Sequence, residues 1–161
     1  AEQFVKAGIP FIFDPGQGLP MFDGEDLKRF IEQSTWMTVN DYESQLVQER
    51  TGLSEAEIAE QVDAYIVTKG GEGSVIYTGG EKITIPNIEV GTIKDPTGCG
   101  DAYRAGLLYG LLNDLDWQTT GQVASLMGGI KIEHEGTQNH SPSKNDLMAR
   151  YQVAFSSEIM L

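Results

Sequence analysis

The stretch Asp95-Pro96-Thr97-Gly98-Cys99-Gly100-Asp101 holds the residues best suited to chemistry, directly before a predicted helix over 101–112. The first N–H groups of a helix have no partner inside it, and the helix dipole adds positive potential there. A glycine loop at that point lets an anion such as a phosphate group approach these N–H groups. The N–H groups of Gly98, Cys99 and Gly100 are therefore candidates for an anion hole.

Asp101 adds a carboxylate at the same point, and two interpretations of it stay open. A general base that takes the proton from an attacking hydroxyl belongs beside a phosphoryl group in transfer. Alternatively, Asp101 caps the helix and the glycines only form a turn. The spacing alone gives the two about equal weight.

The usual nucleotide motifs are absent from the sequence. No GxxxxGK[ST] pattern occurs, which excludes a P-loop NTPase. Gly98-Cys99-Gly100 is not followed by the third glycine of a dinucleotide fingerprint. If ATP binds, a different kind of loop or motif must hold its phosphates.

Composition excludes several classes of protein. The 161 residues include 24 acidic and 11 basic side chains, for a net charge of −13. Nucleic-acid binding requires a basic footprint, which this chain lacks, although backbone N–H groups and a metal can still hold a small phosphorylated ligand. No run of 18 apolar residues could span a membrane. The single cysteine cannot form an internal disulfide, and no Cys/His cluster has zinc spacing.

Strand and helix patterns alternate along the first part of the chain, which predicts βαβ units and a mostly parallel sheet. The expected strands are 9–14, 35–39 and 65–68. The expected helices are 26–33, 41–50, which Gly52 closes, and 54–62, which has a Ser54/Glu57 capping box. A hairpin around Thr78-Gly79-Gly80-Glu81 follows. Beyond it we expect a strand over 87–93 and helices over 101–112 and 118–135. Ser143 with Asp146 is typical of the N-cap of a last helix, which ends near Phe155.

The chain starts without Met, on a pattern that is typical of a helix end closed by Gly8. The beginning of that helix, with its cap, is missing. We therefore expect the chain to be part of a longer protein. Its first residues lack the basic-then-apolar pattern of a signal peptide.

Four stretches, in order, resemble motifs of the ribokinase-like (PfkB) family of sugar and nucleoside kinases. Asn40-Asp41-Tyr42-Glu43 resembles its Asn-x-x-Glu motif, and Thr68-Lys69-Gly70-Gly71-Glu72-Gly73 its Thr-x-Gly-x-x-Gly nucleotide loop. DPTGCGDAYRAGLLYGL is similar to its second signature, and Gly136-Thr137-Gln138-Asn139-His140 falls where its adenine-side loop lies. The resemblance covers Ile9 to about His140. It implies a three-layer ribokinase-like α/β fold, with a mostly parallel sheet flanked by helices and a β-hairpin, of which this chain is the C-terminal portion.

The resemblance also implies roles for particular residues. Asp101 is similar to the catalytic base, and the N–H groups of Gly98, Cys99 and Gly100 to the anion hole for the transferring phosphoryl group. The remaining candidates are Asn40 and Glu43 for Mg²⁺ and phosphate, Thr68, Gly70 and Gly73 for the wall of the ATP site, Thr97 in the nucleotide loop, Asn139 for adenine or ribose, and Asp95 for the monovalent cation (K⁺) of some members.

Two departures from the family pattern stand out. Position 99 is more often Ala, and here it is Cys. At a helix N-terminus the thiol pKa could fall and make Cys99 reactive, or Cys99 is a small packing residue. The larger departure is that the family's N-terminal half, with its first glycine signature, most acceptor-binding residues and the lid, is missing.

The resemblance thus implies an ATP-dependent phosphotransferase that moves the γ-phosphoryl group to a hydroxyl of a sugar or nucleoside. Residues 1–161 form a single domain in this interpretation, the C-terminal nucleotide-binding half, which is inactive by itself. Asp14-Pro15-Gly16-Gln17 and the 136–140 stretch look more like the adenosine- and nucleoside-kinase-like branch than like ribokinase itself, which favours an adenosine-like acceptor. The alternatives are a ribokinase- or fructokinase-type sugar kinase and, from another class, a non-catalytic nucleotide-binding module, which Asp101 disfavours.

The partners that follow are ATP, Mg²⁺ and a small sugar or nucleoside, with no nucleic acid and no membrane. An exposed sheet edge recruits other strands, so we expect this chain to self-associate, or the whole protein to form a homodimer. ATP use, the lack of targeting patterns and a single cysteine favour the cytoplasm.

Overall fold

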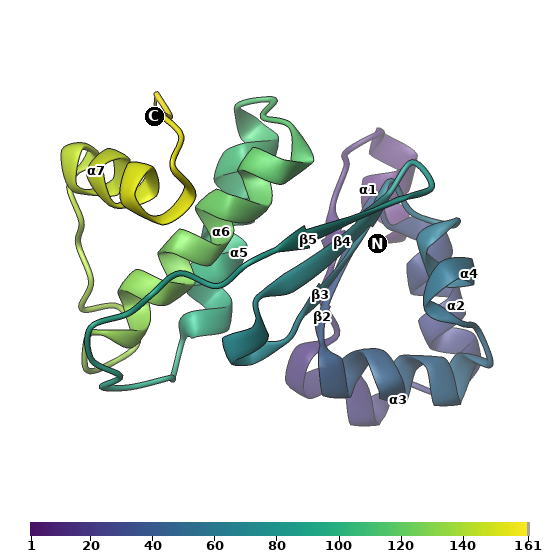
Figure 1. The fold of residues 1–161 in the computed structure, drawn as a ribbon. Coiled ribbons are helices and arrows are strands. Elements are labelled where there is room, and N and C mark those ends of the chain that lie inside the picture. Colours follow the sequence, from purple (N-terminus) through teal and green to yellow (C-terminus); the bar gives the residue numbers. More distant parts are fainter. Residues whose placement is uncertain (161) are drawn as a thin grey trace. The chain divides into compact units, whose positions relative to one another are not determined.

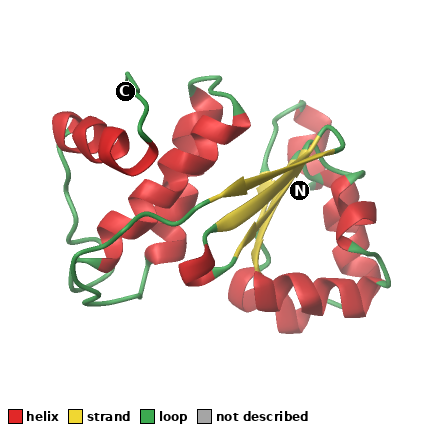
Figure 2. Cartoon of the chain, viewed as in Figure 1, coloured by secondary structure: helices red, strands yellow, loops and turns green. Residues whose placement is uncertain are grey.

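A computed structural model describes residues 1–160, and its contacts divide the chain into two compact units. The first unit contains Ala1–Gly70 and Ser74–Thr84, and the second contains Gly71–Gly73 and the residues from Ile85 onward. Figure 2 shows that the strands gather in one sheet, while helices occur in both units.

The sheet has five strands in the order β1-β2-β3-β4-β5. The strands are β1 (Ile12–Phe13), β2 (Trp36–Asn40), β3 (Ala64–Thr68), β4 (Ser74–Thr78) and β5 (Glu81–Ile85). β1, β2 and β3 pair in parallel, and β4 pairs with β3 antiparallel. The sheet is therefore mixed, because the predicted hairpin adds antiparallel pairing to the predicted parallel strands. Gly79 and Gly80 both have positive φ, as the tight turn between β4 and β5 requires.

Four α-helices and two 3-10 turns complete the first unit. They are α1 (Glu2–Ala7), η1 (Gly16–Met21), α2 (Gly24–Gln33), α3 (Asp41–Thr51), α4 (Glu55–Ala59) and η2 (Gly70–Glu72), the last at the boundary with the second unit. In Figure 1, α2, α3 and α4 lie on the same side of the sheet. Fully buried side chains hold them there, among them Leu27, Ile31, Met37, Val47 and Ile58.

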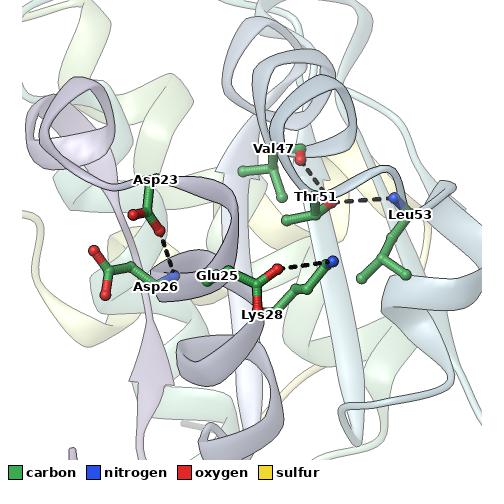
Figure 3. Close-up of polar contacts among 7 residues, drawn as sticks. All are labelled: Asp23, Glu25, Asp26, Lys28, Val47, Thr51 and Leu53. Carbon is green, nitrogen blue, oxygen red and sulfur yellow. Dashed lines mark hydrogen bonds and ion pairs between the residues drawn. The ribbon is translucent and has the colours of Figure 1, made fainter.

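Local hydrogen bonds fix where these helices begin and end (Figure 3). At the start of α2, the Asp23 carboxylate accepts a hydrogen bond of 2.9 Å from the Asp26 N–H. At the end of α3, the Thr51 hydroxyl donates to the Val47 carbonyl at 2.7 Å and accepts from the Leu53 N–H at 3.2 Å. Gly52 then takes the left-handed conformation that ends the helix, as the sequence predicts.

The second unit is built on α5 (Cys99–Leu112), α6 (Trp117–Ile132) and α7 (Lys144–Phe155). Small residues let α5 and α6 approach closely. A Cβ atom on Gly106 would overlap the Ala124 backbone, and one on Gly110 would overlap the Thr120 side chain. α7 begins with the expected Ser143/Asp146 capping box.

The strand expected over 87–93 is wrong, because this segment is a loop packed on α6. Ile88 is 7% exposed and belongs to an apolar cluster with side chains of α6 and α7. It fills the space over Gly129, and the Gly91 N–H donates to the Glu133 carboxylate at 2.8 Å. An extended loop on a helix buries alternate side chains just as a strand does, so the sequence pattern could not separate them.

Among the described residues, no helix is both long enough and apolar enough to cross a membrane.

Candidate functional site

The start of α5 differs from the starts of α2, α3, α4, α6 and α7, and among the described helices only the short α1 also lacks a side-chain cap. Side chains cap α2, α3, α4, α6 and α7, whereas Gly98 caps α5 with φ 85° and no side-chain hydrogen bond. The Cys99 N–H donates to the Pro96 carbonyl at 3.1 Å, which closes the turn before the helix. Within residues 1–160 the N–H groups of Gly98 and Gly100 donate no hydrogen bond. Two of the three predicted donors therefore remain available to an anion.

Asp101 is the third residue of α5, and its side chain is exposed. The N-cap residue is Gly98, so the interpretation of Asp101 as the helix cap is wrong. Its carboxylate accepts no hydrogen bond from the described part of the chain. The carboxylate thus lies one turn or less from the available N–H groups and is open to a reacting group.

The Asp95 carboxylate joins the two loops beside the start of α5. Its Oδ1 accepts from the Thr97 N–H at 2.9 Å and its Oδ2 from the Gly136 N–H at 2.9 Å. These hydrogen bonds, that of Thr97 above all, hold the pKa of Asp95 below its ordinary value. A Cβ atom on Gly98 would lie 3.0 Å from the Thr137 carbonyl, and the φ of 85° also disfavours a side chain at this position. The structure therefore brings Asp95, Thr97 and the anion-hole residues together.

Lys131 is a residue of this region that the sequence analysis missed. It lies at the end of α6, is 0% exposed, and donates from Nζ to the Asp95 carbonyl at 2.7 Å and the His134 carbonyl at 3.0 Å. The sequence signal was a lysine in the last turn of an apolar helix. Basic residues are favoured at helix C-termini in general, so this signal does not indicate a functional site. Arg104 was missed as well, and its guanidinium lies over Gly100.

Cys99 is a packing residue rather than an activated thiol. Burial raises the pKa of its side chain, and its Sγ lies 3.9 Å from the Asp95 carbonyl. The alternative in which the pKa of Cys99 falls is wrong, because the loss of hydration outweighs the lowering effect of the Lys131 charge. Its backbone, not its thiol, contributes to the loop.

Asn40 and Glu43 form a reciprocal capping box at the start of α3. Asn40 Oδ1 accepts from the Glu43 N–H at 2.7 Å, and Glu43 Oε2 accepts from the Asn40 N–H at 2.8 Å. The Asn-x-x-Glu spacing is thus also the spacing of a helix cap. Asn40 pairs in register with Thr68, so both lie at the carboxyl ends of parallel strands, where α/β folds bind ligands.

The other predicted residues have mainly conformational roles in the structure. Gly70 and Gly73 have positive φ, and a Cβ atom on Gly73 would overlap the Ile85 carbonyl. Asn139 is exposed and donates from Nδ2 to the Glu135 carbonyl at 2.9 Å, which closes the loop before α7.

The candidate residues therefore form two clusters, one in each unit. Asn40, Glu43, Thr68 and Gly70 belong to the first unit, and Gly73, Asp95, Thr97, Gly98, Cys99, Gly100, Asp101 and Asn139 to the second. No group of three His, Cys, Asp or Glu side chains in the described chain is arranged to hold a metal ion.

Residues 4–144 match the family described as pfkB family carbohydrate kinase. The chain belongs to this family. A nucleoside kinase of Methanocaldococcus jannaschii is 37% identical over 140 residues, which are 87% of this chain and 46% of that relative. The chain spans about half the length of the curated relatives it matches.

Solved structures of nucleoside kinases have the same fold as this chain. The Burkholderia thailandensis nucleoside kinase in complex with inosine has a TM-score of 0.96 and 49% identity, over 98% of this chain and 52% of that one. The structure of the same kinase in complex with ADP-inosine has a TM-score of 0.96 and 50% identity, over 98% of this chain and 49% of that one. The α/β fold with a five-stranded mixed sheet thus matches ribokinase-like structures over about half their length.

Proposed function

We propose that this chain is the C-terminal nucleotide-binding half of a nucleoside kinase with the three-layer ribokinase-like fold. The observation that carries the proposal is the start of α5, where a glycine cap leaves two N–H groups available and Asp101 stands exposed three residues later. At α2, α3, α4, α6 and α7 a side chain accepts a hydrogen bond from a backbone N–H of the first turn, whereas at α5 no side chain does. An open helix start beside a carboxylate suits phosphoryl transfer to a hydroxyl group.

In the proposed reaction, Asp101 accepts the proton of the nucleoside hydroxyl while the hydroxyl oxygen attacks the γ-phosphorus of ATP. The bond between the γ-phosphorus and the β–γ bridging oxygen breaks, and ADP leaves. The N–H groups of Gly98 and Gly100 stabilise the charge on the transferring group, at about 3 kcal/mol for each well-placed donor. The turn closed by Cys99 and Pro96 holds these donors in place.

Glu43 is the residue that fits a magnesium ion. One of its carboxylate oxygens is held by the Asn40 N–H, and the other accepts no hydrogen bond from the described residues. Mg²⁺ is usually bound through one or two carboxylates, several waters and substrate phosphates, so one fixed carboxylate is enough. When bound, the ion would neutralise phosphate charge.

A nucleoside is a better-supported acceptor than a free sugar. The first relatives that match are named nucleoside kinases, and the Burkholderia thailandensis kinase was solved with inosine. A fructokinase relative matches over 38% of this chain only. Adenosine is the acceptor that the 14–17 and 136–140 stretches favour, and inosine is the one that the relatives suggest.

The test is a phosphorylation assay on the complete kinase that contains this chain, with adenosine, inosine, guanosine, ribose and fructose as acceptors. We expect a nucleoside to be phosphorylated best. Asp101→Asn should lower kcat by about 10²- to 10⁴-fold, the range for a lost general base, with little change in the KM for ATP. Asp114→Asn is the matched control, because Asp114 is an exposed aspartate at the other end of α5 with a positive φ that Asn also tolerates.

Two results would contradict the proposal. Activity of Asp101→Asn near that of the parent would rule out the general base. ATP binding without transfer to any acceptor would favour the non-catalytic nucleotide-binding module. A calorimetric titration of Mg·ATP into the isolated chain, with a melting curve and sedimentation alongside, tests whether this half binds nucleotide alone and self-associates.

A further inference from the structure

Lys131 carries a buried positive charge that the proposed reaction does not use. Its ammonium group donates to the carbonyl of Asp95, which precedes α5, and to the carbonyl of His134, which follows α6. A buried lysine loses much hydration energy, so such groups persist only where dipoles or opposite charges replace the water. Here two carbonyl oxygens and the nearby Asp95 carboxylate replace it.

The family resemblance implies a monovalent cation at Asp95, and the residues present do not fit one. The Asp95 carbonyl accepts a hydrogen bond from Lys131 Nζ, and the two Asp95 carboxylate oxygens accept from the N–H groups of Thr97 and Gly136. The His134 carbonyl, which lies on the neighbouring loop, is also taken by Lys131. A second cation would meet an ammonium of the same charge at these oxygens.

We infer that the Lys131 ammonium is a built-in monovalent cation, which ties the 94–98 loop to the 134–140 loop and so positions the anion-hole N–H groups. The inference about catalysis rests on the proposed kinase function. Lys131 is a positioning residue, because it acts through the Asp95 loop and not on the substrate. Within residues 1–160, the titratable groups near it include Asp95, Cys99, His134 and His140, and of these four Asp95 is the carboxylate that offsets its charge.

The first consequence concerns the unmodified enzyme. If the cation is covalently part of the chain, activity should be the same in K⁺, Na⁺ or tetramethylammonium chloride at constant ionic strength. The KM for ATP and kcat should each agree within about twofold across the three salts. An activation of tenfold or more by K⁺ alone would overturn the inference without any variant.

Variants separate the charge from the bulk of the side chain. Lys131→Ala removes both and leaves room for a small cation, so we expect kcat/KM for ATP to fall by about 10- to 100-fold, the usual cost of a lost supporting group. K⁺ or methylammonium should restore part of this loss, and tetramethylammonium should not. Lys131→Met keeps the bulk without the charge, so its loss should not be restored by any cation. Lys94→Ala, at an exposed lysine on the same loop, is the matched control and should behave as the parent.

Thermal melting provides a readout that does not need activity. Replacing tetramethylammonium by K⁺ should raise the Tm of Lys131→Ala and leave the Tm of the parent and of Lys131→Met unchanged. Equal responses of all three proteins would overturn the inference. The two proposals can fail separately. If no salt supports nucleoside phosphorylation but K⁺ still raises the Tm of Lys131→Ala, the proposed function is wrong and the inference about Lys131 stands.

Discussion

The starts of α3 and α5 both carry candidate site residues, but they treat their first N–H groups in opposite ways. At α3, the side chains of Asn40 and Glu43 bond to each other's backbone N–H at 2.7 and 2.8 Å. At α5, Gly98 supplies no side chain, and the N–H groups of Gly98 and Gly100 stay available. Both starts have the positive end of a helix dipole, yet only α5 offers it to a bound anion.

The difference shows that one kind of helix end can serve two purposes. The closed start of α3 fixes the orientation of a carboxylate whose second oxygen remains usable. The open start of α5 presents backbone donors directly, and these must be fixed by other means, namely the Asp95 hydrogen bonds and Lys131. The predictions below alter one start or the other.

The largest effect is expected at the cap of α5. Gly98→Ala places a side chain on a residue with φ 85° and close to the Thr137 carbonyl. The left-handed conformation costs about 1–2 kcal/mol in unfolding free energy for a non-glycine residue. Displaced donors should lower kcat by about 10²- to 10³-fold. Urea unfolding and the phosphorylation assay measure the two effects.

Gly100→Ala is the control for that change, because a Cβ atom there meets only the flexible end of Arg104. Its free energy of unfolding should stay within about 0.5 kcal/mol of the parent value. If both alanine variants lost the same stability, the special role given to the Gly98 conformation would be wrong.

At α3, Glu43→Gln should separate capping from metal binding. Gln also closes a capping box, so the stability of the protein should change little. The lost charge should raise the Mg²⁺ concentration needed for half-maximal activity by about tenfold. An unchanged Mg²⁺ requirement would show that Glu43 serves α3 alone.

Asn40→Ala should remove the cap itself. Losing an N-cap side chain costs about 1 kcal/mol in unfolding free energy. Ser143→Ala removes the corresponding cap from α7 and should cost a similar amount. Only Asn40→Ala should also weaken nucleotide binding, measured by calorimetry on the complete protein. Weakened binding in both variants would point to general destabilisation.

The smallest effect concerns the pH dependence at Asp95. Because hydrogen bonds hold its pKa below the ordinary 3.8, the charged form stabilises the folded state. This stabilisation is fully present above about pH 4 and is lost as the pH falls through the lowered pKa. Urea unfolding of the parent and of Asp95→Asn should therefore give a difference that shrinks towards pH 3. A difference that stayed constant between pH 7 and pH 3 would contradict this role.

Local sequence patterns predicted the elements that local interactions determine. The capping boxes at Ser54 and Ser143, the helix end at Gly52 and the hairpin turn at Gly79-Gly80 are all confirmed. Each depends on side chains or backbone angles within a few residues. The expected parallel pairing of the first three strands is also confirmed, since βαβ units leave few other arrangements.

Features that depend on distant neighbours were not predictable in this way. Apolar and polar residues alternate over 87–93 because this segment packs on α6. The pKa of Cys99 rises because the folded chain partly buries its thiol. Lys131 contacts Asp95, which lies 36 residues away, so no local pattern indicates its partner. For the candidate site, the anion hole and the role of Asp101 stay predictions from the sequence, whereas the contacts of Lys131 and Asp95 beside them required the structure.

The close contact between α5 and α6 has a consequence for how this protein can vary. α5 starts at the proposed anion hole and Lys131 lies in the last turn of α6, so the spacing of the two helices sets the position of the ammonium group relative to the loop before α5. That spacing depends on side chains that Gly106 and Gly110 do not have. In a mutational scan, these two glycines should be among the least replaceable positions of the second unit, although neither would touch a substrate. The geometry of the proposed site therefore depends on the absence of side chains at Gly106 and Gly110 as well as on the proposed site residues themselves.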